Sequence, residues 1–551
     1  QCWLRCLAPE IEPPVGRRPN NPLAATVGLL LLFFHPPSRL RSMTASNSCA
    51  RPTRDTSWKD VAWLMVSDVV GTSVLTFAGV AHQLGYFLTI TFICGLFPVS
   101  LYVSVLMART RTLLLASARM HGEPEPKVGT MGEITRLVFG TQSASVATYA
   151  SVYGYTLLGQ ASYLLAMGQT AQGFWTRSNL CIAPAIVVSC LCLLPLVVGV
   201  RRLNDAVTLC RANSLLALAV VVVSIWAIVM SGERCVSARP YAVAPDLTLM
   251  HIMGPATNVL YAYAGQWMYF ELMDTMTDAE EFPKAFLVTG PFMVGLYLAV
   301  AMAGTFFGVV EGDIVMGMPR GAAFQVTCTM LFVHVIVVYL IKSIVLARYF
   351  HSLHSPEDLE LKTAGSFAKH AFWGILMLVL CFLVANAIPF FSELMGLIGG
   401  LLAGPINFIA PVYLFLVAHD KHLESTRRLD HLSDYGSTDG AGRSPQQWLP
   451  QQGLAEEDAS EAALRTSTSE DSSSVDETPT LRRACRALCH IPPQEAAFIV
   501  GIVTFVLLTM VLGVSDVVRQ IIAKTNSYGA PFSCHLLEGP QVNASECPRA
   551  P

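Results

Sequence analysis

The sequence predicts an all-α, polytopic membrane protein with about eleven transmembrane helices. Of its 551 residues, 53% are hydrophobic and only 14% are charged, and its mean hydropathy is +0.49. The apolar residues fall in runs of about 20 or more, the length that crosses a hydrocarbon core. A formal net charge of −3 leaves no basic surplus, so the composition indicates a lipid bilayer as the partner and not nucleic acid.

The apolar runs give the expected helices in chain order. They lie at 61–81, 86–107, 145–168, 181–199, 212–231, 248–270, 286–309, 323–347, 370–389, 393–417 and 495–514. We expect residues 1–42 to be a leader or translated non-coding sequence outside the native fold. The chain begins with Gln1, its first methionine is Met43, and its apolar run at 23–34 is too short to span.

The helices divide the chain into four parts. We expect a cytoplasmic N-terminal segment at 1–57, a transmembrane core of ten helices at 58–418, a linker at 419–494, and an eleventh helix with an extracellular or lumenal tail at 495–551. The linker is polar and has no helical period, so it is predicted to be disordered and cytoplasmic. Its clustered serines are candidate phosphorylation sites or part of a solvated tether.

Basic residues set the expected orientation. The connections after the second and fourth helices are rich in them, with Arg109, Arg111, Arg119, Lys127, Arg136, Arg201, Arg202 and Arg211. The opposite-side connections have only Arg177, Arg234, Arg239 and Arg320. The positive-inside rule therefore puts the N-terminus in the cytoplasm. Eleven spans put the C-terminus outside, where Asn543, in an Asn-Ala-Ser triplet, is a predicted glycosylation site.

Two of the expected helices are interrupted near their middles. The first contains Asp68 and a Gly71-Thr72-Ser73 break, and the sixth has a weak point at 262–265. Interrupted helices at the membrane midplane expose backbone N–H and C=O groups that bind ionic substrates. The alternative is that small residues merely allow close helix packing. Because two interruptions occur together with a membrane acid, we favour a transport site.

Four stretches, in this order and spacing, resemble the amino acid/auxin permease family of the APC superfamily, which includes plant amino acid transporters. They are "GTSVLTFAGVAHQLGY" at 71–86, "YAYAGQWMYFELMDTM" at 261–276, "HVIVVYLIKSIV" at 334–345 and "IPFFSELMGLIGGLLAGPINFIAPVYLFL" at 388–416. The resemblance covers about residues 58–418. Ser73, Ala78, Gln266 and Val345 depart from the family pattern, and Ser73 bears most directly on substrate identity because it adds a side chain at the break.

This resemblance implies a leucine-transporter-type fold, in which helices 1–5 and 6–10 are inverted repeats and helix 11 is an addition. It also implies an amino acid as the substrate. The expected substrate-binding residues come from both breaks and from the third helix. They are Val70, Gly71, Thr72, Ser73, Tyr261, Ala262, Tyr263, Ala264, Gly265 and Tyr163, with plain packing as the alternative for Tyr163.

The coupling ion is expected to be a proton. Sodium-coupled relatives use hydroxyl groups of the eighth helix, whereas this chain has Val337 and Val338 at the matching positions. Asp68, His334 and Lys342 are titratable groups at membrane depth, from which transporters build proton relays. The structural alternatives are an ion pair between Asp68 and Lys342, and a packing role for His334.

The first functional hypothesis is a proton-coupled amino acid symporter, with the plasma membrane favoured over a vacuolar or other internal membrane. The alternatives are an organellar amino acid exporter or exchanger and a non-transporting amino acid sensor. An enzyme is not expected, because the intramembrane polar residues include no recognisable nucleophile and base. No catalytic residue, metal site or cofactor is predicted.

Overall fold

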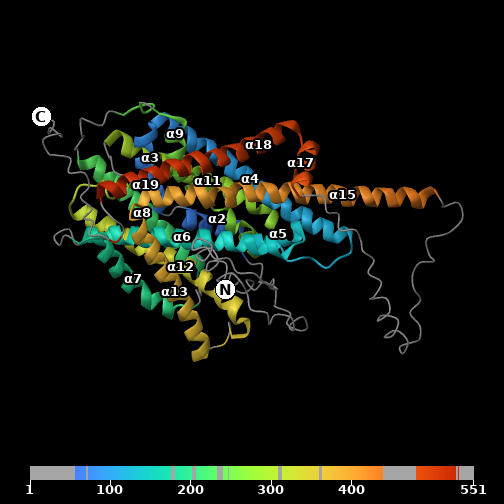
Figure 1. Cartoon of the computed structure of the whole chain (residues 1–551), viewed down its shortest axis with the longest axis horizontal. Helices are drawn as coiled ribbons and strands as arrows, with labels where there is room; N and C mark the ends of the chain where they lie inside the picture. The colour runs from blue at the N-terminus through green and yellow to red at the C-terminus, as the bar shows by residue number, and fades with distance from the viewer. Residues whose placement is uncertain are drawn as a thin grey trace, which may run out of the picture.

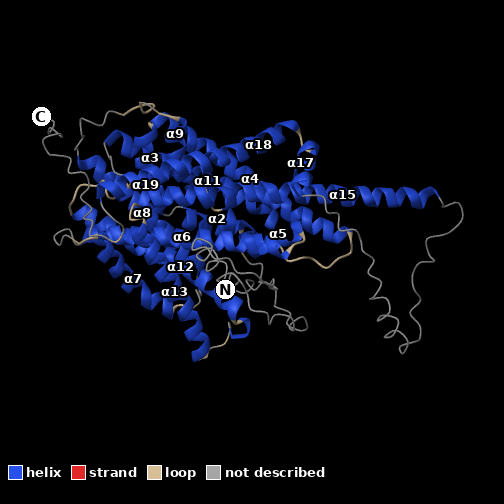
Figure 2. Ribbon diagram, in the orientation of Figure 1, coloured by secondary structure: helices blue, strands red, loops and turns tan. Residues whose placement is uncertain are grey.

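The chain folds as a bundle of helices. The computed structural model describes residues 56–69, 72–174, 180–201, 206–231, 240–245, 247–307, 313–358, 361, 363–438, 480–528 and 532. Within these ranges every secondary-structure element is a helix (Figure 2). The sole strand-like pairing among them is an isolated bridge between Thr56 and Met276. The long helices lie side by side along the horizontal axis of Figure 1, and α15 projects past its neighbours.

The elements follow the expected order of apolar runs. The first half of the bundle contains α2 (Trp58–Val69), η3 (Thr72–Thr76), α3 (Phe77–Leu84), α4 (Tyr86–Met120), α5 (Met131–Phe139), α6 (Gln142–Phe174), α7 (Ile182–Gly199) and α8 (Ala206–Ser231). The second contains α9 (Leu249–Ala262), η4 (Gln266–Met268), α10 (Tyr269–Thr275), η5 (Ala279–Glu281), α11 (Phe282–Phe307), α12 (Ala322–His354), η6 (Pro356–Asp358), α13 (Ala364–Ala387), α14 (Phe391–Ile398), η7 (Gly399–Ala403), η8 (Pro405–Ile409) and α15 (Ala410–Thr438). After these come α17 (Thr480–His490), α18 (Pro493–Leu508), η10 (Thr509–Gly513) and α19 (Val514–Tyr528).

Eight helices in the described ranges are long and apolar enough to cross a membrane. They are Tyr86–Met120, Ile182–Gly199, Thr208–Met230, Ala279–Phe307, Ala322–His354, Ala364–Ala387, Phe391–Arg428 and Pro493–Asn526. The bent pair Trp58–Ser67 and Thr72–Leu84 makes a ninth if it is one span. The expected third and sixth helices, α6 and α9–α10, are present but are not among the eight. The all-α polytopic fold class is confirmed, and the number eleven stays a prediction.

Local sequence explains where the helices begin and end. At α5, the Thr130 side chain accepts a hydrogen bond from the Glu133 N–H, and the Glu133 carboxylate accepts from the Thr130 N–H. This capping box satisfies N–H groups that have no acceptor inside the helix. Gly85, with φ 83°, makes the turn between α3 and α4. There the Tyr86 N–H donates to the Tyr241 carbonyl over 3.0 Å, which ties this turn to the 240–245 segment.

The linker has different bounds from those expected. α15 continues to Thr438, and α17 occupies residues 480–490, so both ends of the expected 419–494 linker are helical. Residues 439–479 lie outside the described ranges, and disorder there stays a prediction. Residues 1–42 and Asn543 also lie outside them.

Three predicted membrane helices, the sixth (α9), the tenth (η7) and the eleventh (η10), cross with little space between their backbones. Gly399 of η7 faces the Thr257 carbonyl of α9, and a Cβ at Gly513 of η10 would lie 2.6 Å from the Met253 carbonyl oxygen. Small residues at such crossings allow the close approach that stabilises helices in a membrane. The eleventh helix is thereby packed directly against α9, the half of the sixth helix that precedes its break.

Gly513→Val is expected to destabilise the protein by about 1–3 kcal/mol, because its side chain would press on main-chain atoms of α9 that cannot move aside. Gly501→Val, on the same eleventh helix, is the matched control, since a Cβ at Gly501 meets no atom within 4 Å. Thermal unfolding in detergent measures the difference. Equal midpoints for the two variants would contradict the close crossing.

Candidate functional site

The first helix breaks where the sequence predicts. α2 ends at Val69 and η3 begins at Thr72, with a 49° bend between the two halves. Val70 and Gly71 lie in the gap and outside the described residues. Thr72 and Ser73 are buried, and the Thr72 hydroxyl has no hydrogen-bond partner among the described residues. The N–H groups that open a helix also have no acceptor inside it, so this break offers polar groups to a ligand.

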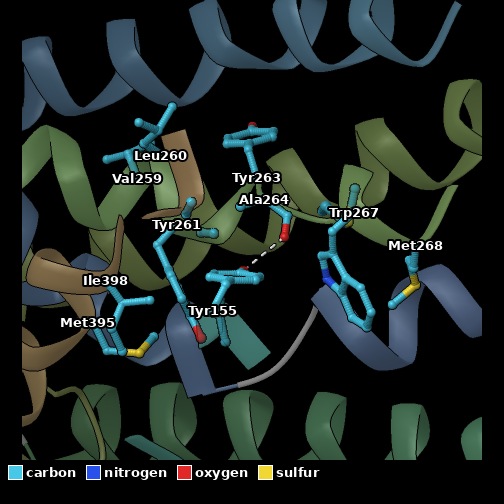
Figure 3. Close-up of a cluster of buried hydrophobic side chains, with 14 of the residues drawn as sticks. Tyr155, Val259, Leu260, Tyr261, Tyr263, Ala264, Trp267, Met268, Met395 and Ile398 are labelled. Carbon is cyan, nitrogen blue, oxygen red and sulfur yellow. Dashed lines mark hydrogen bonds between the residues drawn. The ribbon is translucent and has the colours of Figure 1, made fainter. Parts of the chain in front are cut away.

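The sixth helix breaks at Tyr263-Ala264-Gly265, between α9 and η4 (Figure 3). Its carbonyls are not left exposed. The Ala264 carbonyl accepts from the Tyr155 hydroxyl over 3.1 Å, and the Ala262 carbonyl accepts from the Tyr297 hydroxyl over 2.9 Å. A carbonyl oxygen has two lone pairs, so each can still accept a second bond from a ligand.

Asn407 of η8 holds the other side of this break. Its Oδ1 accepts a hydrogen bond from the main-chain N–H of Trp267 over 2.9 Å, and its side-chain NH₂ donates to the Ala403 carbonyl over 2.9 Å. The sequence reading missed Tyr155, Tyr297 and Asn407. A buried asparagine within the apolar 388–416 stretch is a signal that could have found Asn407, because polar residues inside membrane helices rarely lack a partner.

The two sixth-helix tyrosines point to different neighbours. The Tyr261 ring packs edge-on against Tyr155 of α6, with ring centroids 6.0 Å apart. The Tyr263 hydroxyl instead donates to the Ile93 carbonyl of α4 over 2.8 Å. Tyr261 therefore lies on the side of the break where α6 passes, and Tyr263 lies on the opposite side, against the second helix.

Tyr163, Lys342 and Trp267 come together beside the sixth-helix break. The Lys342 ammonium of α12 donates to the Tyr163 hydroxyl of α6 over 3.1 Å. The same ammonium lies 5.1 Å from the Tyr163 ring centre and 5.9 Å from that of Trp267, within cation–π range. The indole N–H of Trp267 has no partner among the described residues. A membrane-depth cation is thus placed next to unwound backbone.

The other two titratable candidates are placed differently. His334 is buried, and its Nδ1 lies 3.1 Å from Asn213 Oδ1 on α8. It is eight residues before Lys342 on the same helix, or about 12 Å along the axis. Asp68 belongs to the last turn of α2, and its side chain lies outside the description. The structure therefore groups Lys342 with Tyr163 and leaves His334 apart.

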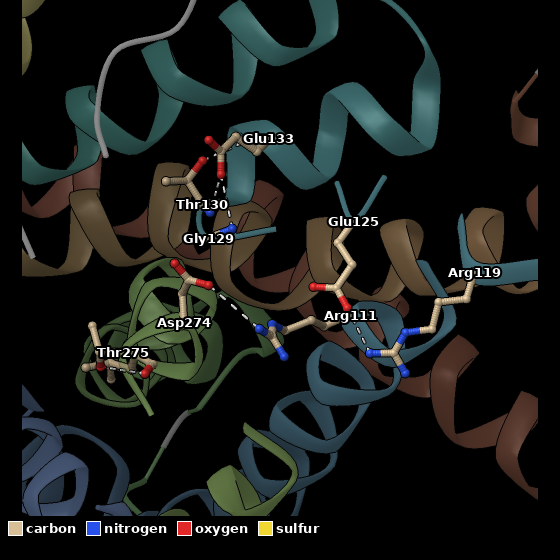
Figure 4. A network of polar contacts seen from close by, with 9 residues as sticks. Arg111, Arg119, Glu125, Gly129, Thr130, Glu133, Asp274 and Thr275 are labelled. Carbon is tan, nitrogen blue, oxygen red and sulfur yellow. Dashed lines mark hydrogen bonds and ion pairs between the residues drawn. The ribbon is translucent and has the colours of Figure 1, made fainter. Parts of the chain in front are cut away.

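The start of the first helix and the end of the sixth are both tied to their surroundings by ion pairs. Asp60 of α2 pairs with Arg211 of α8. Arg111 Nη2 of α4 lies 3.7 Å from Asp274 Oδ1 of α10 (Figure 4). Glu133 lies near this pair, and burial raises the pKa of its carboxyl although the N–H groups of Gly129 and Thr130 donate to it.

The opposite side of the first-helix break is also covered. The Ile314 N–H, in the segment between α11 and α12, donates to the Leu75 carbonyl of η3 over 3.0 Å. Ile314 and Val315 are fully buried there. Contacts thus hold the halves of the first helix on both sides of its break.

Residues 54–434 match the family described as "Transmembrane amino acid transporter protein". This range is more than half of the 551-residue chain. The chain belongs to this family. Membership confirms the resemblance seen in the sequence and makes the protein an amino acid transporter, not an enzyme.

Two relatives of this transporter are distant in sequence. The N amino acid transport system protein of Neurospora crassa is 20% identical over 379 residues, which are 65% of this chain and 75% of that protein. Amino acid transporter AVT1D of Arabidopsis thaliana is 22% identical over 351 residues, which are 60% of this chain and 59% of that protein.

Solved structures of two other transporters align with this one. A manganese transporter mutant of Eremococcus coleocola aligns with a TM-score of 0.38 and 10% identity, over 85% of this chain and 97% of that one. Mhp1, a nucleobase-cation-symport-1 family transporter, aligns with a TM-score of 0.43 and 12% identity, over 87% and 96%. Both TM-scores lie below 0.5.

Asn407→Ala is expected to lower the free energy of unfolding by about 1–3 kcal/mol, because it leaves the buried main-chain N–H of Trp267 without an acceptor. Asn386→Ala is the control, since Asn386 is equally buried but donates only to Phe382 in its own helix. Thermal stability in detergent and substrate affinity are measured for both. A loss of affinity no larger in Asn407→Ala than in the control would show that this contact does not support the site.

Proposed function

We propose that this transporter is a proton-coupled amino acid symporter that works by alternating access. The observation that supports this most directly is the Lys342–Tyr163 contact beside a broken sixth helix. A broken helix can bind the charged groups of an amino acid, and a titratable group next to it can link binding to proton movement. Family membership establishes amino acid transport, and the proton coupling is our proposal.

The proposed substrate site lies between the two breaks. Backbone N–H groups at Thr72 and Ser73 bind the carboxylate, because the start of a helix carries partial positive charge. Tyr261 and Tyr163 border the space toward α6, and Ala264 and Gly265 supply backbone on the other side. Val70, Gly71, Ala262 and Tyr263 complete the proposed set through their backbone positions.

The proposed coupling residues are Asp68 and Lys342. Val338 is buried on α12. The side chains of Val337 and Val338 have no oxygen atom with which to bind a sodium ion, which prefers hard oxygen ligands. His334 is the weaker candidate, because its bond to Asn213 suits a packing role. Protonation that alters the charge at the break would change which of the inward and outward states binds substrate better.

We infer import across the plasma membrane, with the N-terminus cytoplasmic and a glycosylated Asn543 outside. A tagged protein found in a vacuolar membrane would replace import with organellar export or exchange. Binding without flux in purified vesicles would indicate a sensor.

Asp68→Asn is expected to reduce pH-driven accumulation of amino acids in proteoliposomes at least tenfold, because the amide cannot change charge. Exchange of internal for external substrate is expected to persist, since it requires binding and alternation but no net proton transfer. Asp358→Asn is the control, because Asp358 lies between α12 and α13 and pairs with Lys369.

Labelled uptake under a pH gradient, a sodium gradient or neither measures these effects. Full pH-driven accumulation in Asp68→Asn would make Asp68 structural. Wild-type uptake driven by sodium alone would overturn proton coupling while leaving amino acid transport in place.

A further inference from the structure

The helix α17, with the sequence "TLRRACRALCH", is outside the proposed transport site. It is 11 residues long, lies across the end of α18 and separates that helix from α15 (Figure 1). Only two residues separate its last residue, His490, from the first residue of α18, Pro493. α17 is therefore located where a membrane span ends.

One face of α17 is fixed by contacts with α15. Ala484 and Ala487 are buried in this contact. Arg483 lies 3.8 Å from Glu424 and Arg486 lies 3.8 Å from Asp420. The Thr480 hydroxyl accepts a hydrogen bond from Tyr413 over 2.9 Å. These contacts set the rotation of α17 about its axis.

The opposite face carries Leu481, Cys485 and Cys489. The four-residue spacing puts them in one line along the helix. Leu481 is 67% exposed, and both cysteines are exposed and free. Arg482 is also exposed beside this line. A leucine and two thiols flanked by a long basic side chain suit a bilayer interface, where the apolar groups enter the leaflet and the guanidinium stays at the headgroups.

A lipid leaflet is the environment that the neighbouring helix indicates. α18 buries Ile499 and Ile502 but exposes Phe498 and Val500, as expected for a helix with one face toward lipid. The end of the bundle where α17 lies is basic: Arg109 bonds to Glu495 of α18, α15 carries Arg428, and α17 itself carries Arg482. By the positive-inside rule this is the cytoplasmic end, where anionic lipids attract basic side chains.

We propose that Cys485 and Cys489 are S-acylation sites and that the exposed face of α17 lies in the cytoplasmic leaflet. Juxtamembrane cysteines on amphipathic helices are suited to this modification, because their thiols lie at the depth where acyl chains enter the bilayer. Two chains together give stable anchoring where one gives only reversible binding.

The reaction is a transfer between thioesters. The donor is a long-chain fatty acyl thioester, whose carbonyl carbon is attacked by the cysteine sulfur. A new bond forms between that sulfur and the carbonyl carbon, and the bond from the carbonyl carbon to the donor sulfur breaks. The leaving thiolate takes up the proton lost by the cysteine, so no oxidant or reductant is needed.

Acylation of α17 would hold a junction of three membrane helices. Glu495, two residues into α18, accepts from Arg109 over 2.8 Å and from Tyr102 over 3.0 Å, and both donors belong to α4. α17 in turn contacts α15. Chains inserted beside Cys485 and Cys489 would fix this junction relative to the bilayer surface.

Mass-tag exchange on the full-length protein in cell membranes tests the proposal. Free thiols are blocked, thioesters are cleaved with neutral hydroxylamine, and the released thiols are labelled with polyethylene glycol maleimide. The wild type is expected to gain two tags that Cys485→Ser/Cys489→Ser lacks, with one tag lost in each single variant. Cys192→Ser, which removes an exposed cysteine within the α7 span, is expected to leave the tag number unchanged.

Leu481→Asp tests the leaflet placement separately. A carboxylate on the exposed face opposes insertion, so the tagged fraction is expected to fall several-fold while the contacts of α17 with α15 remain. Size-exclusion profiles matching the wild type show that the variants fold. A tag number in Cys485→Ser/Cys489→Ser equal to that of the wild type, or tags that form without hydroxylamine, would overturn S-acylation at these residues. Unchanged tagging of Leu481→Asp overturns the leaflet placement.

Discussion

The requirement that the rest of the structure depends on is the satisfaction of main-chain polar groups inside a membrane. Lipid offers no hydrogen bonds, so a helix can break there only where protein groups replace the lost bonds. At the sixth helix those groups are the Tyr155 and Tyr297 hydroxyls and the Asn407 amide. They come from three different helices. The break therefore determines where α6, α11 and η8, which carry these three residues, must pass.

This requirement links the two halves of the fold. The hydroxyls and the amide reach the break only if the helices approach closely, and glycines at the crossings of the sixth, tenth and eleventh helices permit this. Residues that lie near the break are then of two kinds. Some, such as Tyr297, complete the backbone, while others, such as Lys342, contribute charge to the space beside it.

Sequence alone predicted the helical class, the order of the helices and both breaks, because apolar runs and small-residue interruptions depend on local composition. It did not identify Tyr155 or Asn407, since their value lies in a contact with a carbonyl or an N–H more than a hundred residues away. It placed Arg111 in a loop, whereas α4 is 35 residues long and carries this arginine to Asp274. A count of apolar residues finds only the membrane-spanning part of a helix, so the polar turns that extend α4 beyond it were missed. The extension of α15 to Thr438 was missed for the same reason.

The bridge between Thr56 and the end of α10 is made by main-chain atoms alone. The Thr56 N–H donates to the Thr275 carbonyl over 3.3 Å, and the Thr277 N–H donates to the Thr56 carbonyl over 3.2 Å. Side chains take no part, so substitutions here other than proline leave the bridge able to form. The start of the first helix and the end of the sixth are thereby joined through a contact that does not depend on which side chains lie there.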